Sequence, residues 1–369
     1  MNRFLEKKIV VKIGSSLLVE NGVLREKWLK NFAENFAELV NKKTQIVIVT
    51  SGAIALGRDI FGDHKLMLEE KQAAAAIGQI NLMSNYRDIF KKFDLNIAQI
   101  LLTASDCNSR QRYLNSQNTI ETLLKNRVIP IINENDSVAV DEIKIGDNDR
   151  LAARVAQMIS ADLLILFSDI DGLYDKNPNK KDAKFIFQVD KITKEIENMA
   201  EGSGSKVGTG GMITKIQAAK MACLAGCKTI ITSGVEQNCL KNLFFGEKKY
   251  TIFNGEKSNK SRKKWLSGLI NASGEVIINN CAKEVLLNKK TSLLPIGAVK
   301  IKGDFKAGDA IFIKDEQGNH IASGISNYAA LEVKKILEKK SHEVKEILGK
   351  LAKKELVHID NLVVVYEAI

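Results

Sequence analysis

Proline, cysteine and long apolar runs are all scarce in this sequence. Its 369 residues include only three prolines, which excludes long proline-rich linkers. No apolar run approaches the roughly 20 residues needed to cross a bilayer, so the sequence predicts no membrane partner. The charged start, Met1 to Glu6, predicts no signal peptide. The five cysteines are odd in number and include no Cys-x-x-Cys pair, which favours reduced thiols and a cytoplasmic location.

The sequence also lacks the motifs of several common enzyme classes. Gly-Lys-Ser/Thr does not occur, which excludes a P-loop, and both Gly-x-Ser-x-Gly and His-Arg-Asp are missing. The four histidines are scattered without metal-ligand spacing. These absences argue against Ser-His chemistry, metal-dependent hydrolysis and a metal site built from protein side chains.

What is present fits a globular protein of two or three domains. The mass is 40.8 kDa, apolar residues make up 45% and charged residues 27%, which excludes wholesale disorder. Lys and Arg number 55 against 44 Asp and Glu, and this net charge of +11 favours anionic partners. Residues 247–264 include seven basic and two acidic residues, a local excess of +5. Residues 276–369 include fifteen basic and twelve acidic residues, an excess of only +3.

Apolar β-branched runs alternate with helical patterns along the first two thirds of the chain. The runs predicted as strands are residues 9–13, 45–50, 97–102, 128–132, 163–167 and 229–232. The helical patterns occupy residues 25–39, 66–93, 108–125, 148–159 and 212–225. This alternation predicts an α/β fold with a mostly parallel sheet between helices. Ligands in such folds bind beyond the carboxyl ends of the strands.

The character of the sequence changes near residue 255. We expect a first domain over residues 1–255, a basic linker over 256–274 and a small β-rich domain over 275–369. The strands predicted in this last domain are residues 275–278, 298–301, 309–314 and 362–366. Two helical patterns, 329–339 and 342–354, precede the last strand.

Lys12 lies inside an apolar predicted strand and is followed by Gly14, Ser15 and Ser16. Lysine is rarely buried without a partner. At the end of a strand it can direct its ammonium group to a phosphate held over a turn rich in N–H groups. The alternative is an edge-strand lysine whose stem lies along the protein while its head reaches water.

Lys215 follows the most glycine-rich stretch of the chain. Five glycines occur within residues 202–211, and a helix is predicted to begin at Met212. Glycine lets backbone amides approach phosphate oxygens, and the helix N-terminus adds positive potential. A lysine in the first helical turn opposes the helix dipole, and a bound phosphate would remove that conflict.

Polar residues also follow three other predicted strands. Residues 133–137 read Asn-Glu-Asn-Asp-Ser, and Asp147, Asn148 and Asp149 stand where a helix begins. Turn formation explains such residues one at a time but not their clustering at two strand-to-helix junctions. Ser51 can cap a helix or receive a carboxylate. Ser168 and Asp169 fit either an ordinary turn or a nucleotide contact.

Two lysines, a glycine-rich helix start and aspartates at strand ends together indicate phosphoryl transfer. This chemistry depends mainly on positioning and charge stabilisation. An alcohol acceptor would need a general base, and the sequence offers no obvious one. A carboxylate acceptor has a pKa of about 4.3 and is already ionised at pH 7, so the missing base indicates an acyl phosphate product.

In chain order, these motifs resemble the amino acid kinase family. They are Val-Val-Lys-Ile-Gly-Ser-Ser, Val-Thr-Ser-Gly-Ala-Ile, Ile-Asn-Glu-Asn-Asp-Ser-Val, Gly-Asp-Asn-Asp, Ser-Asp-Ile-Asp-Gly-Leu-Tyr and Gly-Thr-Gly-Gly-Met-x-Thr-Lys. The tail motifs Ser-Leu-Leu-Pro-Ile-Gly and Gly-Asp-Phe-x-x-Gly-Asp resemble a PUA domain. The resemblance covers essentially the whole chain and implies the amino acid kinase fold followed by a PUA-like domain.

The resemblance also implies an activity and a site. The combination of kinase motifs and PUA tail is most similar to family members that use ATP and Mg²⁺ to phosphorylate the side-chain carboxylate of L-glutamate, on the way to proline. It implies catalytic roles for Lys12, Lys215 and Asp149. Substrate-binding roles would fall to Ser51, Asp136 and Asn148. The implied ATP-binding residues are Lys12, Ser168, Asp169, Thr209, Gly210, Gly211, Met212, Ile213, Thr214 and Lys215.

The resemblance implies further partners and leaves two alternatives. Members of the family are usually homo-oligomers and often inhibited by proline. One alternative is a sister kinase with a different carboxylate acceptor. The other is an RNA-binding protein acting through the PUA-like domain, but the small charge excess of residues 276–369 predicts a weak electrostatic footprint for nucleic acid.

Overall fold

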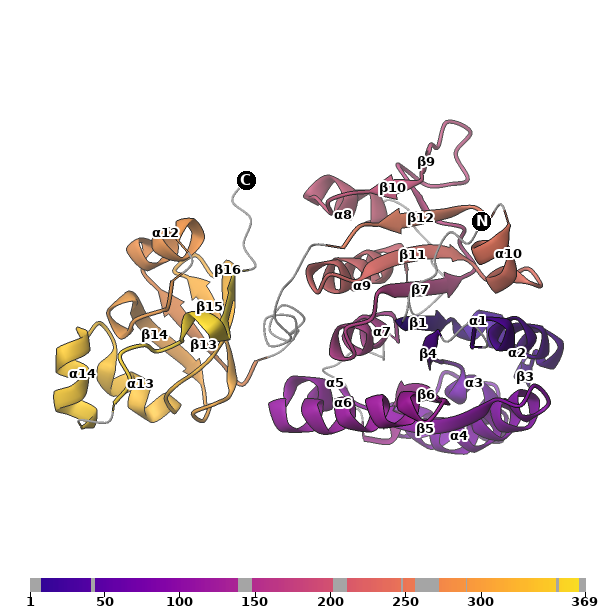
Figure 1. Cartoon of the computed structure of the whole chain (residues 1–369), viewed down its shortest axis with the longest axis horizontal. Helices are drawn as coiled ribbons and strands as arrows, with labels where there is room; N and C mark the ends of the chain where they lie inside the picture. The colour runs from indigo at the N-terminus through magenta and orange to yellow at the C-terminus, as the bar shows by residue number, and fades with distance from the viewer. Residues whose placement is uncertain are drawn as a thin grey trace. The chain divides into compact units, whose positions relative to one another are not determined.

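The computed structural model describes residues 8–40, 44–138, 148–201, 211–246, 248–255, 272–289, 291–349 and 352–364. They form two compact units, one built on an eight-stranded sheet and the other on a five-stranded sheet (Figure 1). None of the helices within these ranges combines the length and apolar character needed to cross a membrane.

The larger unit has the strand order β10-β12-β11-β7-β1-β4-β6-β5. Its strands are β1 (Lys8–Ile13), β4 (Gln45–Val49), β5 (Asn96–Leu102), β6 (Val128–Glu134), β7 (Leu163–Ser168), β10 (Gln188–Val189), β11 (Lys228–Ser233) and β12 (Tyr250–Phe253). From β11 through β5 every neighbouring pair is parallel, which confirms the predicted mostly parallel sheet. Only β12, with β10 beside it, runs against the others.

Helices cover both faces of this sheet, as the sequence predicts. The helices that lie between its strands along the chain are α1 (Ser15–Leu18), α2 (Glu26–Val40), α3 (Ala53–Gly57), α4 (Leu68–Lys91), α5 (Ala104–Asn108), α6 (Arg110–Lys125), α7 (Asn148–Met158), α8 (Lys194–Glu201), α9 (Met212–Leu224) and α10 (Cys239–Phe245). On one face α7 and α9 pack together over β1, β7 and β11, while α2, α4 and α10 supply the core of the other.

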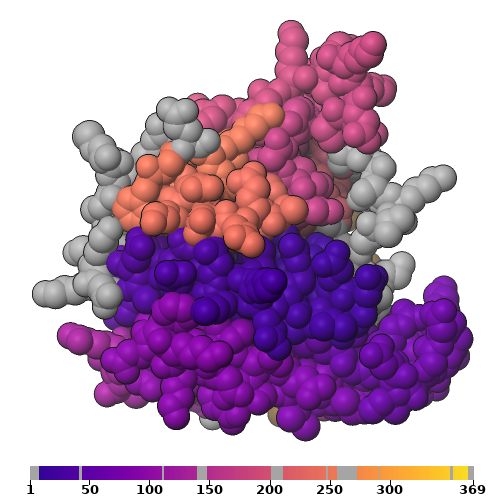
Figure 2. Space-filling view, turned by 90° about the vertical axis from the view of Figure 1, so that its right-hand side faces the viewer, coloured from indigo at the N-terminus to yellow at the C-terminus, as the bar shows by residue number. Residues whose placement is uncertain are grey.

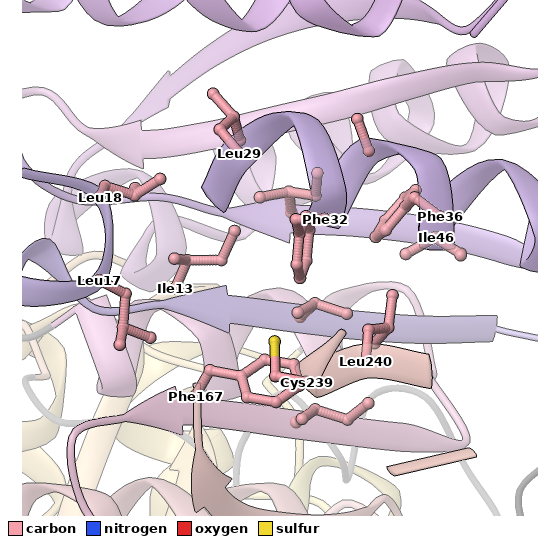
Figure 3. Packing of buried hydrophobic residues seen from close by; sticks show 14 of the residues in the cluster. Ile13, Leu17, Leu18, Leu29, Phe32, Phe36, Ile46, Phe167, Cys239 and Leu240 are labelled. Carbon is pink, nitrogen blue, oxygen red and sulfur yellow. The ribbon is translucent and has the colours of Figure 1, made fainter. Parts of the chain in front are cut away.

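Aromatic side chains dominate the core on the α2 side. Phe32 meets Phe167 of β7 edge to face, with 6.3 Å between the ring centroids. Trp28 stacks on Phe32 at 5.1 Å. Figure 3 shows Phe32 pointing from α2 toward the strands that carry Ile13 and Phe167. Each such ring pair adds about 0.5–1.5 kcal/mol of stability to that gained from the apolar area it buries. These contacts therefore hold the end of β7 against α2.

The loop after β11 is tied to α2 by polar contacts. The Trp28 Nε1 donates to the Gly234 carbonyl at 2.7 Å. The Asn31 Nδ2 donates to the Asn238 Oδ1 at 2.8 Å, and the Asn238 backbone N–H donates back to the Asn31 Oδ1 at 2.6 Å. Figure 2 shows the two segments in contact, orange above indigo. These bonds hold the carboxyl end of β11 in a fixed place.

Lys12 lies on the opposite face from this aromatic core. Side chains alternate along a strand, so Ile13 and Val11 face the core below α2 and Lys12 faces α7 and α9. Strand β1 pairs with β4 on one side and β7 on the other. The alternative of a lysine on an edge strand is therefore wrong.

Several short elements of the larger unit were not predicted. They include α8, α10 and β12, the last of which lies inside the basic stretch that begins at Glu247. The four residues of β12 are too few to show a periodicity, and pairing with β11 makes the strand. Of the predicted linker 256–274, residues 256–271 lie outside the described ranges and Gly274 already belongs to a strand, so the domain boundaries stay a prediction.

The smaller unit has the strand order β14-β13-β15-β16-β17. Its elements are β13 (Gly274–Ile278), α12 (Asn280–Asn288), β14 (Ala298–Gly303), β15 (Ala310–Asp315), β16 (His320–Ile325), α13 (Ala330–Ile336), α14 (Ser341–Leu348) and β17 (Leu362–Val364). All pairs except β13 with β15 are antiparallel, which confirms a small β-rich domain. The sequence did not predict β16 or α12.

Helices α3 and α4 cross at a distance that only glycine allows. A Cβ atom at Gly78 would lie 1.8 Å from the Ala53 carbonyl oxygen, and one at Gly57 would lie 2.1 Å from the Ala74 carbonyl oxygen. Glycine within a helix costs about 1 kcal/mol relative to alanine. At Gly57 and Gly78 the close approach of the two helices explains why glycine is present. This packing holds the start of α3 against α4.

We expect Gly78→Ala to destabilise the protein by about 1–3 kcal/mol, because the methyl group forces the two helices apart. At an open helical position the same change would raise stability, so the sign itself is diagnostic. Thermal or denaturant unfolding measures it. Asn81→Ala, at an exposed position of the same helix, is the control and should shift stability by no more than about 0.5 kcal/mol. An unchanged or raised melting temperature for Gly78→Ala would contradict the packing argument.

Candidate active site

The candidate residues gather at the carboxyl edge of the parallel sheet. Because β1, β4, β6 and β7 run in the same direction, Gly14, Ser51 and Asp136 follow strand ends at that edge, where Ser168 is the last residue of β7. The Gly14 N–H donates to the Phe167 carbonyl at 3.2 Å, which ties the loops after β1 and β7 together. Residues that are distant in the sequence therefore lie along the same edge of the sheet.

At the centre of the site, one carboxylate holds two lysines. The Lys12 Nζ lies 2.6 Å from the Asp149 Oδ1, and the Lys215 Nζ lies 3.1 Å from the Asp149 Oδ2. Asp149 is fully buried, and the two lysines are 8% and 3% exposed. The arrangement brings together strand β1 and the first turns of α7 and α9, as the sequence-based hypothesis requires.

The charge of Asp149 depends on its two partners. Burial alone would raise the pKa of this carboxyl, but the ammonium groups of Lys12 and Lys215 outweigh it and hold the pKa below its ordinary value. The carboxylate is therefore ionised at neutral pH. Within the described part of the chain it faces two ammonium groups beside the N-terminus of α9, an arrangement that suits an anionic ligand.

The start of α9 supplies further groups for such a ligand. The helix begins after Gly211, where an added Cβ would meet no atom of the described residues within 4 Å. The Thr214 hydroxyl lies 2.7 Å from the Gly211 carbonyl and 3.2 Å from the Asp149 Oδ2. The conflict between Lys215 and the helix dipole is offset by Asp149 in the structure itself, rather than by phosphate alone.

The remaining predicted nucleotide residues differ in their settings. Met212 is buried and lines a cavity of about 30 Å³ with Ile170 and Tyr174, while Ile213 is half-buried. The Ser168 hydroxyl accepts the Ile170 N–H at 3.2 Å, so part of its role is local turn formation. Asp169 is exposed. Thr209 and Gly210 lie outside the described residues.

A chain of amide side chains runs away from the lysines. The Asn148 Nδ2 donates to the Ser51 Oγ at 2.9 Å and to the Asn133 Oδ1 at 3.2 Å. Because Ser51 is engaged with Asn148 and α3 begins after Gly52, the helix-capping alternative for Ser51 is wrong. Asn133 then donates to the Gln79 Oε1 at 2.8 Å. No local pattern indicated Gln79, which is one of several polar residues within a long predicted helix.

Asp136 lies beyond this chain, in a cleft of about 230 Å³. Gln79, Glu134 and Asn135 also line the cleft, together with parts of α4 and β5. Burial raises the pKa of the Asp136 carboxyl to about 6. At pH 7 it is mostly ionised without a cationic partner among the residues described here, so it suits the ammonium group of a ligand.

Two regions of the chain match known protein families. Residues 7–233 match the amino acid kinase family, and residues 274–348 match the PUA domain. Glutamate 5-kinases from Paramagnetospirillum magneticum and Brucella abortus are 44% and 45% identical to the chain, over 97% of its length and 97% and 96% of theirs.

Two solved structures are also similar, each matching 68% of this chain and 99% of its own. One is a carbamate kinase from Giardia lamblia bound to AMP-PNP, with 17% identity and a TM-score of 0.49. The other is a UMP kinase from Ureaplasma parvum, with 20% identity and a TM-score of 0.45. On the strength of the sequence matches, the chain belongs to the amino acid kinase family and carries a PUA domain.

Proposed function

We propose that this protein transfers the terminal phosphoryl group of ATP to the side-chain carboxylate of L-glutamate, giving L-glutamyl 5-phosphate, the first step toward proline. The observation that carries the proposal is the pair of ammonium groups on Asp149, at the sheet edge beside Asn148. The glutamate 5-kinases that match 97% of the chain support this acceptor over that of a sister kinase. A match of that length also favours a kinase over an RNA-binding protein.

The chemistry requires charge neutralisation rather than proton transfer. An oxygen of the ionised substrate carboxylate attacks the terminal phosphorus, and the bond from that phosphorus to the leaving ADP oxygen breaks. In the proposal Lys12 and Lys215 neutralise the phosphoryl oxygens as charge shifts toward ADP. Asp149 pairs with both ammonium groups and holds them in place, and therefore acts as a positioning residue.

The donor set at the start of α9 fits ATP. Two lysines and a helix N-terminus suit a polyphosphate. Among the described residues no group of three or more His, Cys, Asp and Glu side chains is placed to hold a metal ion. We assign no side chain to Mg²⁺, which enters the proposal bound to ATP. Cytoplasmic location, homo-oligomerisation and inhibition by proline stay predictions.

A hydroxamate assay tests the proposal. The protein is incubated with ATP, Mg²⁺ and hydroxylamine, with L-glutamate, L-aspartate or N-acetyl-L-glutamate as the acceptor. An acyl phosphate is trapped as a hydroxamate, so we expect product from L-glutamate alone. Product formed only from another acceptor would sink the proposal. A salt-dependent gel shift with structured RNA, combined with no turnover of any acceptor, would favour the RNA-binding alternative.

Glutamate binding should weaken in acid as Asp136 takes up a proton. With a pKa of about 6, this carboxylate holds the substrate ammonium at pH 7.5 but is mostly neutral at pH 5. We expect the KM for L-glutamate to rise about tenfold between these values, while the KM for ATP changes much less. Steady-state kinetics across this range measures both.

Asp136→Asn is the matched variant for this prediction. It should bind L-glutamate weakly at every pH and lose the acid dependence. The pKa of Asp136 is higher in the folded than in the unfolded protein, so its ionisation lowers stability as the pH rises from about 4 to 6. Asp136→Asn is therefore expected to melt at a higher temperature than the unaltered protein at pH 8. A variant that keeps both substrate affinity and acid dependence would contradict this role.

A further inference from the structure

One amide beside the candidate active site has a nitrogen without a partner. Gln79 of α4 accepts a hydrogen bond from the Asn133 Nδ2 at 2.8 Å through its Oε1. Its Nε2 is buried, and no acceptor for it exists among the described residues. Leaving a buried donor unpaired destabilises a protein, so such groups are rare and call for an explanation.

The hydrogen bonds of the amide chain fix which end is a donor and which an acceptor. Asn148 gives its Nδ2 to Ser51 and Asn133, which leaves the Asn148 Oδ1 buried and unpaired within the described residues. Asn133 passes the same polarity on to Gln79. Within the described residues, the chain therefore has an unused acceptor at Asn148, near the lysines, and an unused donor at Gln79, two hydrogen bonds further along.

The place of Gln79 selects the group that it can bind. It lines the same 230 Å³ cleft as Asp136. The reacting carboxylate of the substrate must lie near Lys12 and Lys215, beside Asn148. The other carboxylate of L-glutamate is bonded to the α-carbon, which also carries the ammonium group that Asp136 suits. An N–H donor beside Asp136 and remote from the lysines is thus placed for that second carboxylate.

We propose that Gln79 is a substrate-binding residue whose Nε2 donates to the α-carboxylate of L-glutamate, and that Asn133 positions it by holding its carbonyl. This inference rests on the proposed function, and it adds a residue that selects amino acids carrying an α-carboxylate. The buried Asn133, 2% exposed, keeps the Gln79 amide from turning over.

Two substitutions and a matched control test the inference. Gln79→Met keeps the length of the side chain and removes the donor, and we expect kcat/KM for L-glutamate to fall ten- to a hundredfold, mainly through KM. The kcat/KM of Gln79→Glu should fall further, because this variant places a protein carboxylate next to the α-carboxylate of the substrate. Asn81→Ala removes an exposed amide from the same helix, at a position that does not line the cleft, and should stay within twofold of the unaltered protein. Melting temperatures confirm that each variant is folded.

An acceptor analogue shows which substrate group Gln79 contacts. 4-Aminobutyrate lacks the α-carboxylate, so its inhibition constant should be equal in the unaltered protein and in Gln79→Met. For L-glutamate, the dissociation constant measured by calorimetry without ATP should rise at least tenfold. An equal loss for both compounds, or tighter binding of L-glutamate by Gln79→Glu, would overturn the assignment. The latter would mean that Gln79 accepts from the ammonium group.

The same measurements separate this inference from the proposed function. If the unaltered protein forms no hydroxamate from L-glutamate, the function and the role of Gln79 fall together. If it does form hydroxamate while Gln79→Met keeps its affinity for L-glutamate, only the role of Gln79 is wrong.

Discussion

Replacing Lys215 with methionine is expected to lower kcat about a hundred- to a thousandfold. Removing a single preorganised group that stabilises transition-state charge costs this much in other enzymes. Methionine has a similar length and suits a site that is only 3% exposed. Asp149 keeps Lys12 as a partner at 2.6 Å, so the variant should remain folded. Steady-state kinetics and a thermal melt measure the two effects together.

Lys220→Met is the matched control for this experiment. It makes the same substitution five residues further along α9, at an exposed lysine paired with Glu197. A surface pair of this kind contributes about 0–1 kcal/mol, so turnover should be unchanged. If Lys215→Met instead keeps its turnover but melts far below the unaltered protein, Lys215 is a structural residue.

Asp149→Asn should produce the largest loss of stability among the variants considered. The amide has the same shape as the carboxylate but no charge, so the buried Lys12 and Lys215 ammonium groups lose the negative charge that they share. Breaking a buried ion pair in this way costs about 3–5 kcal/mol. Turnover should also collapse, because the two lysines are no longer held in place. Denaturant unfolding measures the stability, and the hydroxamate assay measures the activity.

Two further measurements separate charge from shape. Inorganic phosphate should raise the melting temperature of Asp149→Asn more than that of the unaltered protein, because the anion replaces the missing charge. A triple variant, Lys12→Met with Asp149→Leu and Lys215→Met, should recover most of the lost stability and remain inactive. A triple variant as unstable as Asp149→Asn would show that the defect arises from packing rather than charge.

Several residues of the candidate site stand out in the sequence by a local pattern. Lys12 and Lys215 could be singled out because each breaks a local rule: a charge within an apolar strand, and a cation at the start of a helix. Asn148 and Asp149 stood out because polar residues cluster at a helix start. Each of these signals lies within a few neighbouring residues.

Gln79 and β12 gave no such signal. A glutamine is ordinary in a helix, and only the hydrogen bond from Asn133, 54 positions away, makes its orientation unusual. The four residues of β12 become a strand by pairing with β11, and the basic residues around them obscured the pattern. Both features depend on contacts between segments that no local pattern records.

By itself, then, the sequence determined the class of fold, the order of its main strands and helices, and the residue types at the strand ends. These follow from side-chain periodicity and backbone preferences, which act over a few residues. Only the tertiary structure decided that Lys12 and Lys215 share the Asp149 carboxylate and that Gln79 stands at the end of the amide chain. The order in which strands pair sets those distances, and strand pairing is fixed by the packing of the whole sheet.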